Sequence, residues 1–313
     1  MLGFGCSAMM GRVGRKQSLA ALTVAYDNGV IFYDTARSYG YGESEALLGE
    51  FLHGRRDHVL LSTKFGILPA STSHWKRAFK PIARTLLRLA PGARKAMHRQ
   101  LTAMSSAGHF SLTALHESLH ASLRALRTDY IDLLFLHEPP PNVFQQEDLF
   151  AALRQLVAAG KIRRFGIASQ PEIIEASLAA PPPGLGSVQF PCNVFSLRMP
   201  YEWLKSEIDL IAIANHPFGG AAGIATAKRL LTSLANHPTT PAALREKLRP
   251  IDDALLADAV LNVITRDTGV HVVVPSMLRP DHLRANLAAI EHSRFSSEEI
   301  RWLRDAILAT PRP

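Results

Sequence analysis

Short runs of apolar residues alternate along the chain with longer stretches whose apolar positions recur at helical spacing. The apolar runs predict eight strands, at 2–6, 30–34, 59–64, 131–137, 162–168, 187–190, 208–214 and 270–274. The clearest helical stretches lie between them, at 17–27, 44–52, 112–126, 149–159 and 254–268. Nearly continuous apolar strands that are separated by helices are typical of a parallel sheet covered on both faces.

The number of strands favours a closed (β/α)8 barrel, the TIM barrel, over an open doubly wound sheet. An open dinucleotide-binding sheet would carry G-x-G-x-x-G after its first strand, and Gly3, Gly5 and Gly11 do not have that spacing. The chain has 313 residues, of which 47% are hydrophobic, which is enough for one large core. We therefore expect residues 1–313 to form a single α/β barrel domain.

One connection is much longer than the loops that usually join a strand to its helix. It covers residues 69–110, after the third strand, and holds eight Lys or Arg residues but no Asp or Glu. Outside this basic insertion, the other 27 Lys and Arg balance the 27 Asp and Glu, so the net charge of +8 belongs to the insertion. We expect it to lie over the active-site face, as a lid that selects acidic or phosphorylated substrates or as a plain surface loop. A nucleic-acid interface would rest on this charge alone, and we expect no nucleic-acid partner.

The cysteines and the apolar runs bear on the cellular compartment. The two cysteines, Cys6 and Cys192, are too few for a disulfide framework and fit a reducing environment. No apolar run approaches the length of a membrane-spanning helix, and the first residues lack a signal-peptide pattern. We expect a cytoplasmic protein that does not bind membranes.

Polar side chains stand at the ends of three predicted strands. These residues are Asp34, Lys64 and His137, and Tyr39 follows Asp34 by five positions in the loop after the second strand. The C-terminal ends of the strands are where a barrel enzyme holds its catalytic residues. An acid, an amine, an imidazole and a phenol that converge there can form a proton donor for carbonyl chemistry.

Two alternatives concern the same residues. Tyr41 competes with Tyr39 for the role of the phenol, although the spacing from Asp34 favours Tyr39. Glu138 could join Asp34 and His137 in a metal site, because carboxylates and histidines at strand ends are common ligands in metal-dependent hydrolases. We expect no metal, since the first strand carries no H-x-H motif.

Several short motifs repeat a known pattern: D-T-A-x-x-Y-G at 34–40, G-x-S-E at 42–45, T-K at 63–64, L-H at 136–137 and K-I-R-x-x-G-I at 161–167. Together they resemble the aldo-keto reductase superfamily nearly from end to end. The resemblance implies a (β/α)8 barrel that reduces small-molecule carbonyl substrates with NADP(H). Because most members of the family are monomers, we expect a monomer.

The resemblance also implies roles for the four polar residues. Hydride transfer to a carbonyl leaves negative charge on its oxygen, and Tyr39 would supply the proton if its phenolate is stabilised. Lys64 would stabilise that phenolate, and Asp34 would keep Lys64 charged in a site of low dielectric constant. His137 would hydrogen-bond the substrate oxygen and orient it. The nicotinamide itself carries the hydride chemistry.

The same resemblance places the cofactor in the second half of the chain. It implies that the glutamine of the sixth strand meets the nicotinamide carboxamide, that a loop after the seventh strand covers the pyrophosphate, and that the segment after the eighth strand holds the adenosine 2′-phosphate and the adenine. The expected cofactor-binding residues are Ser169, Gln189, Pro217, Phe218, Gly219, Ser276, Met277, Arg279, His282 and Asn286. Backbone amides at a helix start near 281 would suit an anion.

Several of these positions depart from the family pattern. The S-N pair of the fifth strand is Ala168-Ser169, and Asn215 stands where an aromatic residue stacks on the nicotinamide. Ser276 replaces a lysine and His282 an arginine, so Arg279 is left to supply positive charge for the 2′-phosphate. We expect NADPH rather than NADH. The altered nicotinamide pocket leaves open a second interpretation, a regulatory module that binds the cofactor with little turnover.

Overall fold

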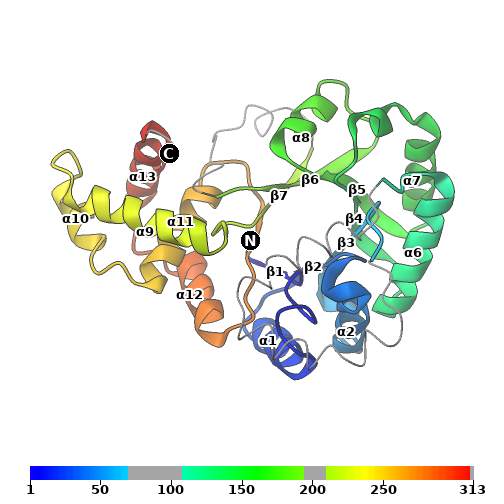
Figure 1. The fold of residues 1–313 in the computed structure, drawn as a ribbon, viewed down its shortest axis with the longest axis horizontal. Helices are drawn as coiled ribbons and strands as arrows, with labels where there is room; N and C mark the ends of the chain where they lie inside the picture. Colours follow the sequence, from blue (N-terminus) through cyan, green and yellow to red (C-terminus); the bar gives the residue numbers. More distant parts are fainter. Residues whose placement is uncertain (70–107, 194–208, 311–313) are drawn as a thin grey trace, which may run out of the picture.

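The computed structural model describes residues 1–69, 108–193 and 209–310. Eight parallel strands are hydrogen-bonded in chain order. They are β1 (Gly3–Gly5), β2 (Phe32–Asp34), β3 (Leu60–Phe65), β4 (Ile131–His137), β5 (Ile162–Ala168), β6 (Leu185–Pro191), β7 (Ile211–Asn215) and β8 (Val272–Val274). A parallel bridge between Leu2 and Val273 brings β8 back to β1, so the sheet is nearly closed into a barrel (Figure 1). The predicted strands and the (β/α)8 fold are confirmed.

Helices surround the barrel and connect its strands (Figure 1). They are α1 (Arg15–Asp27), α2 (Ser44–Phe51), α6 (Leu112–Leu126), α7 (Glu147–Ala158), α8 (Pro171–Leu178), α9 (Gly220–Asn236), α10 (Ala242–Lys247), α11 (Asp253–Thr265), α12 (Pro280–Glu291) and α13 (Ser297–Ala309), with the 3-10 helices η1 (Tyr39–Gly42), η2 (Arg56–His58) and η3 (Pro141–Gln145). The apolar pattern predicts α1, α2, α6, α7 and α11 but misses α8, α9 and α10. α9 begins Gly-Ala-Ala-Gly, whose small side chains give little contrast between its faces. Among the described helices, none is both long enough and apolar enough to cross a lipid bilayer.

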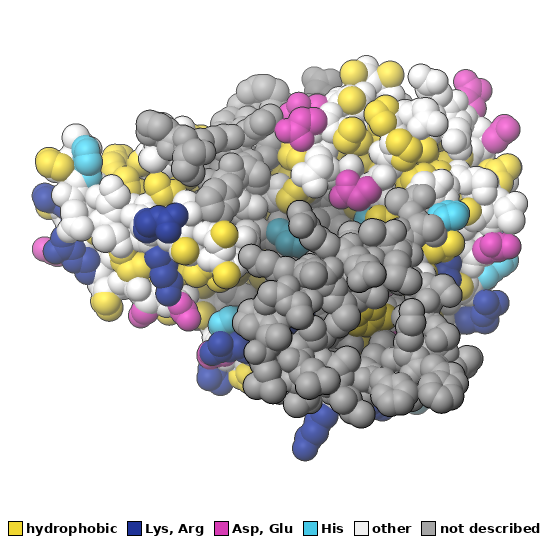
Figure 2. Space-filling model, viewed as in Figure 1, with side chains coloured by type: hydrophobic (Ala, Val, Ile, Leu, Met, Phe, Trp, Pro, Cys, Tyr) yellow, Lys and Arg dark blue, Asp and Glu magenta, His cyan; other side chains and the backbone are white. Residues whose placement is uncertain are grey.

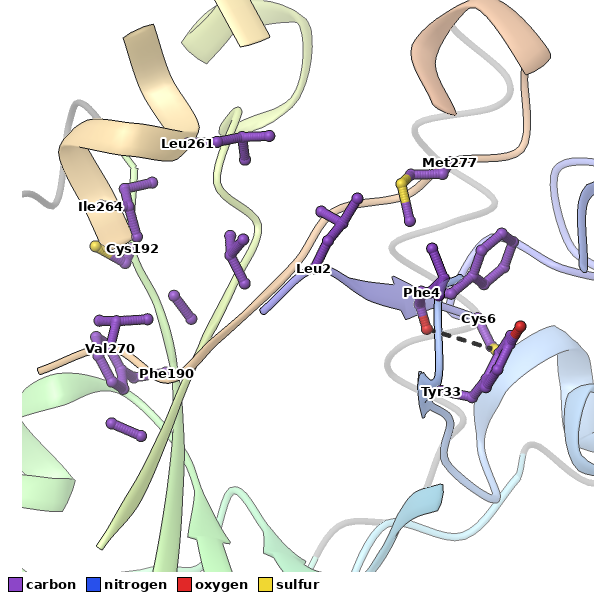
Figure 3. Packing of buried hydrophobic residues seen from close by; sticks show 14 of the residues in the cluster. Leu2, Phe4, Cys6, Tyr33, Phe190, Cys192, Leu261, Ile264, Val270 and Met277 are labelled. Atoms are coloured by element: carbon purple, nitrogen blue, oxygen red, sulfur yellow. Dashed lines mark hydrogen bonds between the residues drawn. The ribbon is translucent and has the colours of Figure 1, made fainter. Parts of the chain in front are cut away.

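The strands separate two apolar clusters, one inside the barrel and one between the barrel and its helices. The inner cluster consists of Phe32, Leu133, Phe135, Ala168, Ile213, Val272 and Val274. Figure 3 shows part of the outer cluster, in which Phe4, Cys6 and Tyr33 pack together. Because side chains alternate along a strand, Asp34 continues the inward row of Phe32, and His137 continues that of Phe135. The inner cluster therefore lies directly below these polar side chains, inside the barrel.

The sequence of α6 explains both its boundaries and its place against the barrel. The Ser111 hydroxyl accepts a hydrogen bond from the Ala114 amide at 3.2 Å and caps the start of the helix. Leu115, Leu119 and Leu126 are buried at helical spacing, and Arg127 ends the helix in the left-handed conformation. The same buried face also carries serines, which reach the loop after β2, as described below.

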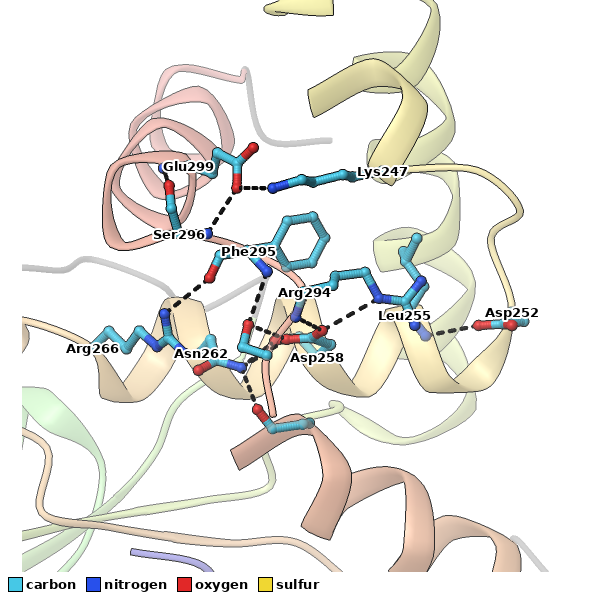
Figure 4. Close-up of polar contacts among 12 residues, drawn as sticks. Lys247, Asp252, Leu255, Asp258, Asn262, Arg266, Arg294, Phe295, Ser296 and Glu299 are labelled. Carbon is cyan, nitrogen blue, oxygen red and sulfur yellow. Dashed lines mark hydrogen bonds and ion pairs between the residues drawn. The ribbon is translucent and has the colours of Figure 1, made fainter. Parts of the chain in front are cut away.

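A buried carboxylate, Asp258, holds α11 against the connection from α12 to α13 (Figure 4). Asp258 of α11 accepts hydrogen bonds from the Ser293 hydroxyl at 2.6 Å and from the Arg294 amide at 2.9 Å. Asn262, one turn later, donates to Asp258 Oδ1 at 2.9 Å and to the Ala289 carbonyl at 2.8 Å. The connection from α12 to α13 is thus tied to α11 by groups that are all satisfied.

Most of the basic insertion, residues 70–107, lies outside the described residues, so its position over the active-site face stays a prediction. Its last residues are described: the His109 amide donates to the Gly66 carbonyl at 3.1 Å, and the rings of Phe110 and Phe65 are 5.8 Å apart. Elsewhere, Lys and Arg side chains gather over α9 and α10 (Figure 2). Some of them are paired with acids, as in Lys228–Asp253 at 2.8 Å.

Candidate active site

A buried ion pair lies at the C-terminal ends of β2 and β3. Lys64 Nζ donates to both carboxylate oxygens of Asp34, at 2.7 and 2.8 Å, and to the Thr35 carbonyl at 2.9 Å. The Ser62 hydroxyl donates to Asp34 Oδ1 at 2.7 Å. Burial by itself would lower the pKa of Lys64, but the Asp34 carboxylate and the Tyr39 phenol outweigh it, and the pKa is raised. Lys64 is therefore charged at neutral pH although it is only 2% exposed.

Tyr39 is the phenol beside this ion pair. The Lys64 ammonium lies 5.0 Å from the centre of the Tyr39 ring. The next residue, Gly40, has a φ of 59°, and a Cβ atom there would lie 2.7 Å from the Met9 carbonyl oxygen. Only glycine fits this turn, and the turn sets the direction of Tyr39. Burial raises the pKa of Tyr39, and the charge of Lys64 and its hydrogen bond oppose that rise.

His137, the last residue of β4, completes the group. Its ring meets the Tyr39 ring edge-on, with the ring centres 6.1 Å apart and the planes at 86°. Burial, and then the charge of Lys64, lower the pKa of His137 to about 3. The imidazole is therefore neutral at physiological pH and can donate one N–H. Its Nδ1 atom is buried and has no hydrogen-bond partner among the described residues.

The strand register explains why residues so far apart in sequence meet. Asp34 of β2 lies opposite Ser62 of β3, and Lys64 of β3 lies opposite Phe135 of β4. His137 is two residues beyond Phe135, on the same inward row. The barrel thus brings Asp34, Tyr39, Lys64 and His137 together at its C-terminal end.

An unpartnered amide lies across the barrel from these residues. Gln189 of β6 is fully buried, and neither its Oε1 nor its Nε2 atom has a hydrogen-bond partner among the described residues. A buried amide without partners is costly unless a ligand supplies a donor and an acceptor, as a carboxamide does. The neighbouring Ser169 hydroxyl donates to Glu138 Oε2 at 2.9 Å, which leaves its lone pairs free to accept. These groups fit the carboxamide of a nicotinamide.

The turn between β7 and α9 offers backbone amides. Gly219 caps α9 with a φ of 60°, and Gly220 follows with a φ of 68°. The N-cap residue is a glycine and has no side chain to cap this helix, so its first N–H groups and the positive end of its dipole suit an anion such as a pyrophosphate. In the same turn, His216 Nδ1 lies 2.9 Å from Asn215 Oδ1, Pro217 is buried and Phe218 is half-buried.

The segment after β8 has mixed suitability for the adenosine end of a cofactor. Ser276 is exposed, whereas the Met277 side chain is fully buried in the outer cluster (Figure 3), which leaves only its backbone for a ligand. Arg279 is exposed but forms an ion pair with Asp281, and this pairing weakens its field toward a phosphate. His282 is half-buried. Asn286 is buried, and its Nδ2 atom has no partner among the described residues, so it can donate to a ligand.

A second buried carboxylate, Glu45, was seen in the sequence only as part of a helix start. The Thr63 hydroxyl donates to Glu45 Oε1 at 2.6 Å, directly behind Lys64 on β3. Burial raises the pKa of Glu45, and hydrogen bonds from Thr63 and Ser122 oppose that rise. Nearby, Arg37 donates to the Ser118 hydroxyl at 3.0 Å and ties the loop after β2 to α6. The bonds of Glu45 to Thr63 and of Arg37 to Ser118 join segments that are far apart in sequence, so the sequence alone does not show them.

The chain also contains one H-E-x-x-H pattern, His116-Glu117-Ser118-Leu119-His120. The two histidines lie on the exposed face of α6, with their ring centres 6.4 Å apart. In residues 1–69, 108–193 and 209–310, no group of three or more His, Cys, Asp or Glu side chains could hold a metal ion. The pattern is thus separate from the strand-end residues.

Comparison with known proteins agrees with this geometry. Aldo-keto reductase YhdN of Bacillus subtilis is 31% identical over 61% of this chain, and the match spans about half of YhdN, 48%. Uncharacterized oxidoreductase YqkF of the same organism is 25% identical over 96% of this chain and 90% of YqkF. The crystal structure of an aldo/keto reductase from Klebsiella pneumoniae, in complex with NADP and acetate, has a TM-score of 0.66 and 25% identity, and covers 100% of this chain and 92% of that one.

The family model described as the aldo/keto reductase family matches residues 1–307. That range contains all eight strands and every strand-end residue discussed above. The chain belongs to the aldo/keto reductase family.

Proposed function

We propose that the protein reduces an aldehyde or ketone to the alcohol, with the hydride from NADPH and the proton from Tyr39. The observation that carries this proposal is the buried Lys64–Asp34 ion pair beside the Tyr39 ring. A binding module has no need for a buried cation next to a phenol, and such a cation is costly without a chemical use.

Each of the four residues has a defined task in this reaction. When NADPH is bound, it supplies the hydride. As the carbonyl carbon accepts the hydride, negative charge grows on the oxygen, and Tyr39 Oη transfers its proton there. Lys64 Nζ stabilises the phenolate left behind, and Asp34 keeps Lys64 protonated. Tyr39 regains a proton from solvent before the next turnover.

His137 acts as a neutral hydrogen-bond donor in this scheme. Because its pKa is about 3, it cannot deliver a proton as an imidazolium at neutral pH. Its N–H can still bind the carbonyl oxygen and stabilise the charge that develops there. This separates the proton donor, Tyr39, from the group that positions the substrate.

For the cofactor, we propose contacts of Ser169 and Gln189 with the carboxamide and of the 217–219 turn with the pyrophosphate. The amide of Gln189, unpartnered among the described residues, and the glycine N-cap of α9 support these assignments. We propose that Ser276, Met277, Arg279, His282 and Asn286 hold the adenosine end, Met277 through its backbone. NADPH is preferred over NADH because the similar Klebsiella enzyme binds NADP.

We further propose a monomeric, cytoplasmic enzyme formed by one domain, with the basic insertion at 69–110 over the active-site face. The buried, unpaired thiols of Cys6 and Cys192 suit a reducing compartment.

The test is a fluorescence titration with NADPH and NADH, followed by turnover on a panel of aldehydes that includes 4-nitrobenzaldehyde. Tyr39→Phe should bind NADPH as the unaltered protein does but lose turnover, whereas Tyr41→Phe, two residues away, should keep it. Binding without turnover on any carbonyl would support the regulatory module instead. Absence of binding to either nucleotide would overturn the proposed cofactor site.

A further inference from the structure

The β4–β5 side of the site carries a carboxylate that the proposed reaction does not use. Glu138 directly follows His137 and takes the left-handed conformation, with a φ of 53°. Its amide donates to the Ala168 carbonyl at 2.8 Å, and its Oε2 atom accepts from the Ser169 hydroxyl at 2.9 Å. A non-glycine residue held in this conformation by two contacts points to a functional constraint. The carboxylate is thus fixed at the strand ends where His137 lies.

The described residues provide no charge that neutralises this carboxylate. Asp34 shares its charge with Lys64, and Asp132 at the other end of the barrel meets Arg56 at 2.8 Å. Within residues 1–69, 108–193 and 209–310, no Lys, Arg or His forms an ion pair with Glu138, whose carboxylate is partly buried at its bond to Ser169. Burial raises the pKa of its carboxyl, and the Ser169 hydrogen bond opposes that rise.

We propose that Glu138 selects substrates by charge, so that the enzyme prefers carbonyl compounds with an ammonium group and rejects those with a carboxylate. The inference rests on the proposed reductase function and names the substrate class of that same site. Glu138 directly follows His137, with Cα atoms about 3.8 Å apart. Its carboxylate is held by Ser169 at the end of the neighbouring strand, so it acts on a substrate whose carbonyl oxygen is bound at His137. At a separation of about 7 Å in partly solvated surroundings, one unit charge changes binding on the order of tenfold.

Charges of both signs act on the β7 side of the site. Burial lowers the pKa of His216; the charge of Asp34 opposes that fall, and the charges of Lys64 and Arg12 add to it. A basic lid that selects acidic substrates, the alternative considered for residues 69–110, predicts the opposite order of preference.

The test compares kcat/KM for two charged aldehydes, 4-formyl-N,N,N-trimethylanilinium and 4-formylbenzoate, in the unaltered enzyme and in Glu138→Gln. Because the intrinsic reactivity of each aldehyde cancels between the two enzymes, the cation-to-anion ratio reports only the change at Glu138. Because loss of the charge should weaken the cation about tenfold and favour the anion about tenfold, we expect that ratio to fall about a hundredfold in Glu138→Gln. The expected fall should shrink with added salt. Glu291→Gln, at the far end of α12, makes the same change in net charge and should leave the ratio unaltered.

Binding gives a second readout that does not need turnover. In the NADPH-loaded protein, Glu138→Gln should tighten benzoate and weaken benzylammonium, measured by calorimetry. Equal ratios in the two enzymes, or a higher preference for the anion in the unaltered enzyme, would overturn the charge selection while leaving the reductase intact. Charge-dependent binding without any turnover would instead support the inference at Glu138 and overturn the proposed reaction.

Discussion

Lys64 Nζ lies 2.7 and 2.8 Å from the two carboxylate oxygens of Asp34, and both side chains are almost excluded from solvent. Each charge is tolerable there only because the other is present, since an unpaired ion inside a protein loses its hydration without compensation. The pair therefore couples the stability of the barrel to the charge that the proposed chemistry requires.

Asp34→Asn should destabilise the protein by about 3–5 kcal/mol, because it leaves the ammonium of Lys64 buried and uncompensated. Urea unfolding measures this loss as a change in the free energy of unfolding. The matched control is Asp253→Asn, which breaks the exposed pair with Lys228 and should cost about 0–1 kcal/mol. The double variant Asp34→Asn/Lys64→Met should recover part of the loss, and strict additivity would contradict this coupling.

Stability should fall in acid because of His137. Its pKa in the folded state, about 3, lies below the ordinary 6.5, so unfolding takes up a proton between those values. The stability that the neutral ring contributes is complete above pH 6.5 and is lost as the pH falls, with a slope of about 1.4 kcal/mol per pH unit for this residue. His137→Gln should remove that part of the slope in urea unfolding at several pH values. His120→Gln, on the exposed face of α6, should not change it.

Gln189→Leu should separate cofactor binding from folding. Since neither amide atom of Gln189 has a described partner, an apolar replacement of similar size should stabilise the free protein by about 1–3 kcal/mol. The same change should weaken NADPH binding, because the carboxamide loses its donor and acceptor. The melting temperature of the free protein and the NADPH dissociation constant test the two parts. Tighter NADPH binding in Gln189→Leu would contradict the assignment.

Gly40→Ala should disturb the Tyr39 turn far more than its conformation alone implies. The φ of 59° costs alanine about 1 kcal/mol, and the added Cβ atom would also press on the Met9 carbonyl. Gly160→Ala provides the control, because Gly160 has a φ of 69° but open space around the added Cβ atom. Turnover should drop in Gly40→Ala and persist in Gly160→Ala. Equal stability losses in the two variants would show that the turn tolerates a side chain.

Much of this fold could be predicted because local patterns determine it. Strands such as 131–137 are apolar on both faces, as buried parallel strands must be, and α6 combines a serine cap with leucines at helical spacing. α9 was missed because its first turn consists of small residues. Asp34, Lys64 and His137 could be foreseen together because a parallel barrel places all its strand ends on one face.

The rest of the site depends on contacts that no local pattern encodes. The hydrogen bond from Ser169 to Glu138 joins the ends of two strands, and the one from Thr63 to Glu45 joins a strand to a helix. The low pKa of His137 comes from burial by distant segments. Likewise, nothing in the letters around Gln189 shows that its amide lacks a partner. Burial and hydrogen bonds between distant segments are set only by the folded chain.

The junction between β1 and β8 has a dynamic consequence. Residues 131–137 of β4 pair with β5 at six positions, whereas the two ends of the sheet meet at one bridge, from Leu2 to Val273, supported by hydrogen bonds from Met1 to His271, from Val273 to Met1 and from Gly5 to Pro275. Local opening should be easiest where the fewest backbone bonds must break. Amide hydrogens of β1 and β8 should therefore exchange with solvent before those of β4 and β5. Because residues 276–286 follow β8 directly, a nucleotide bound there would slow that exchange and stabilise the junction between β1 and β8.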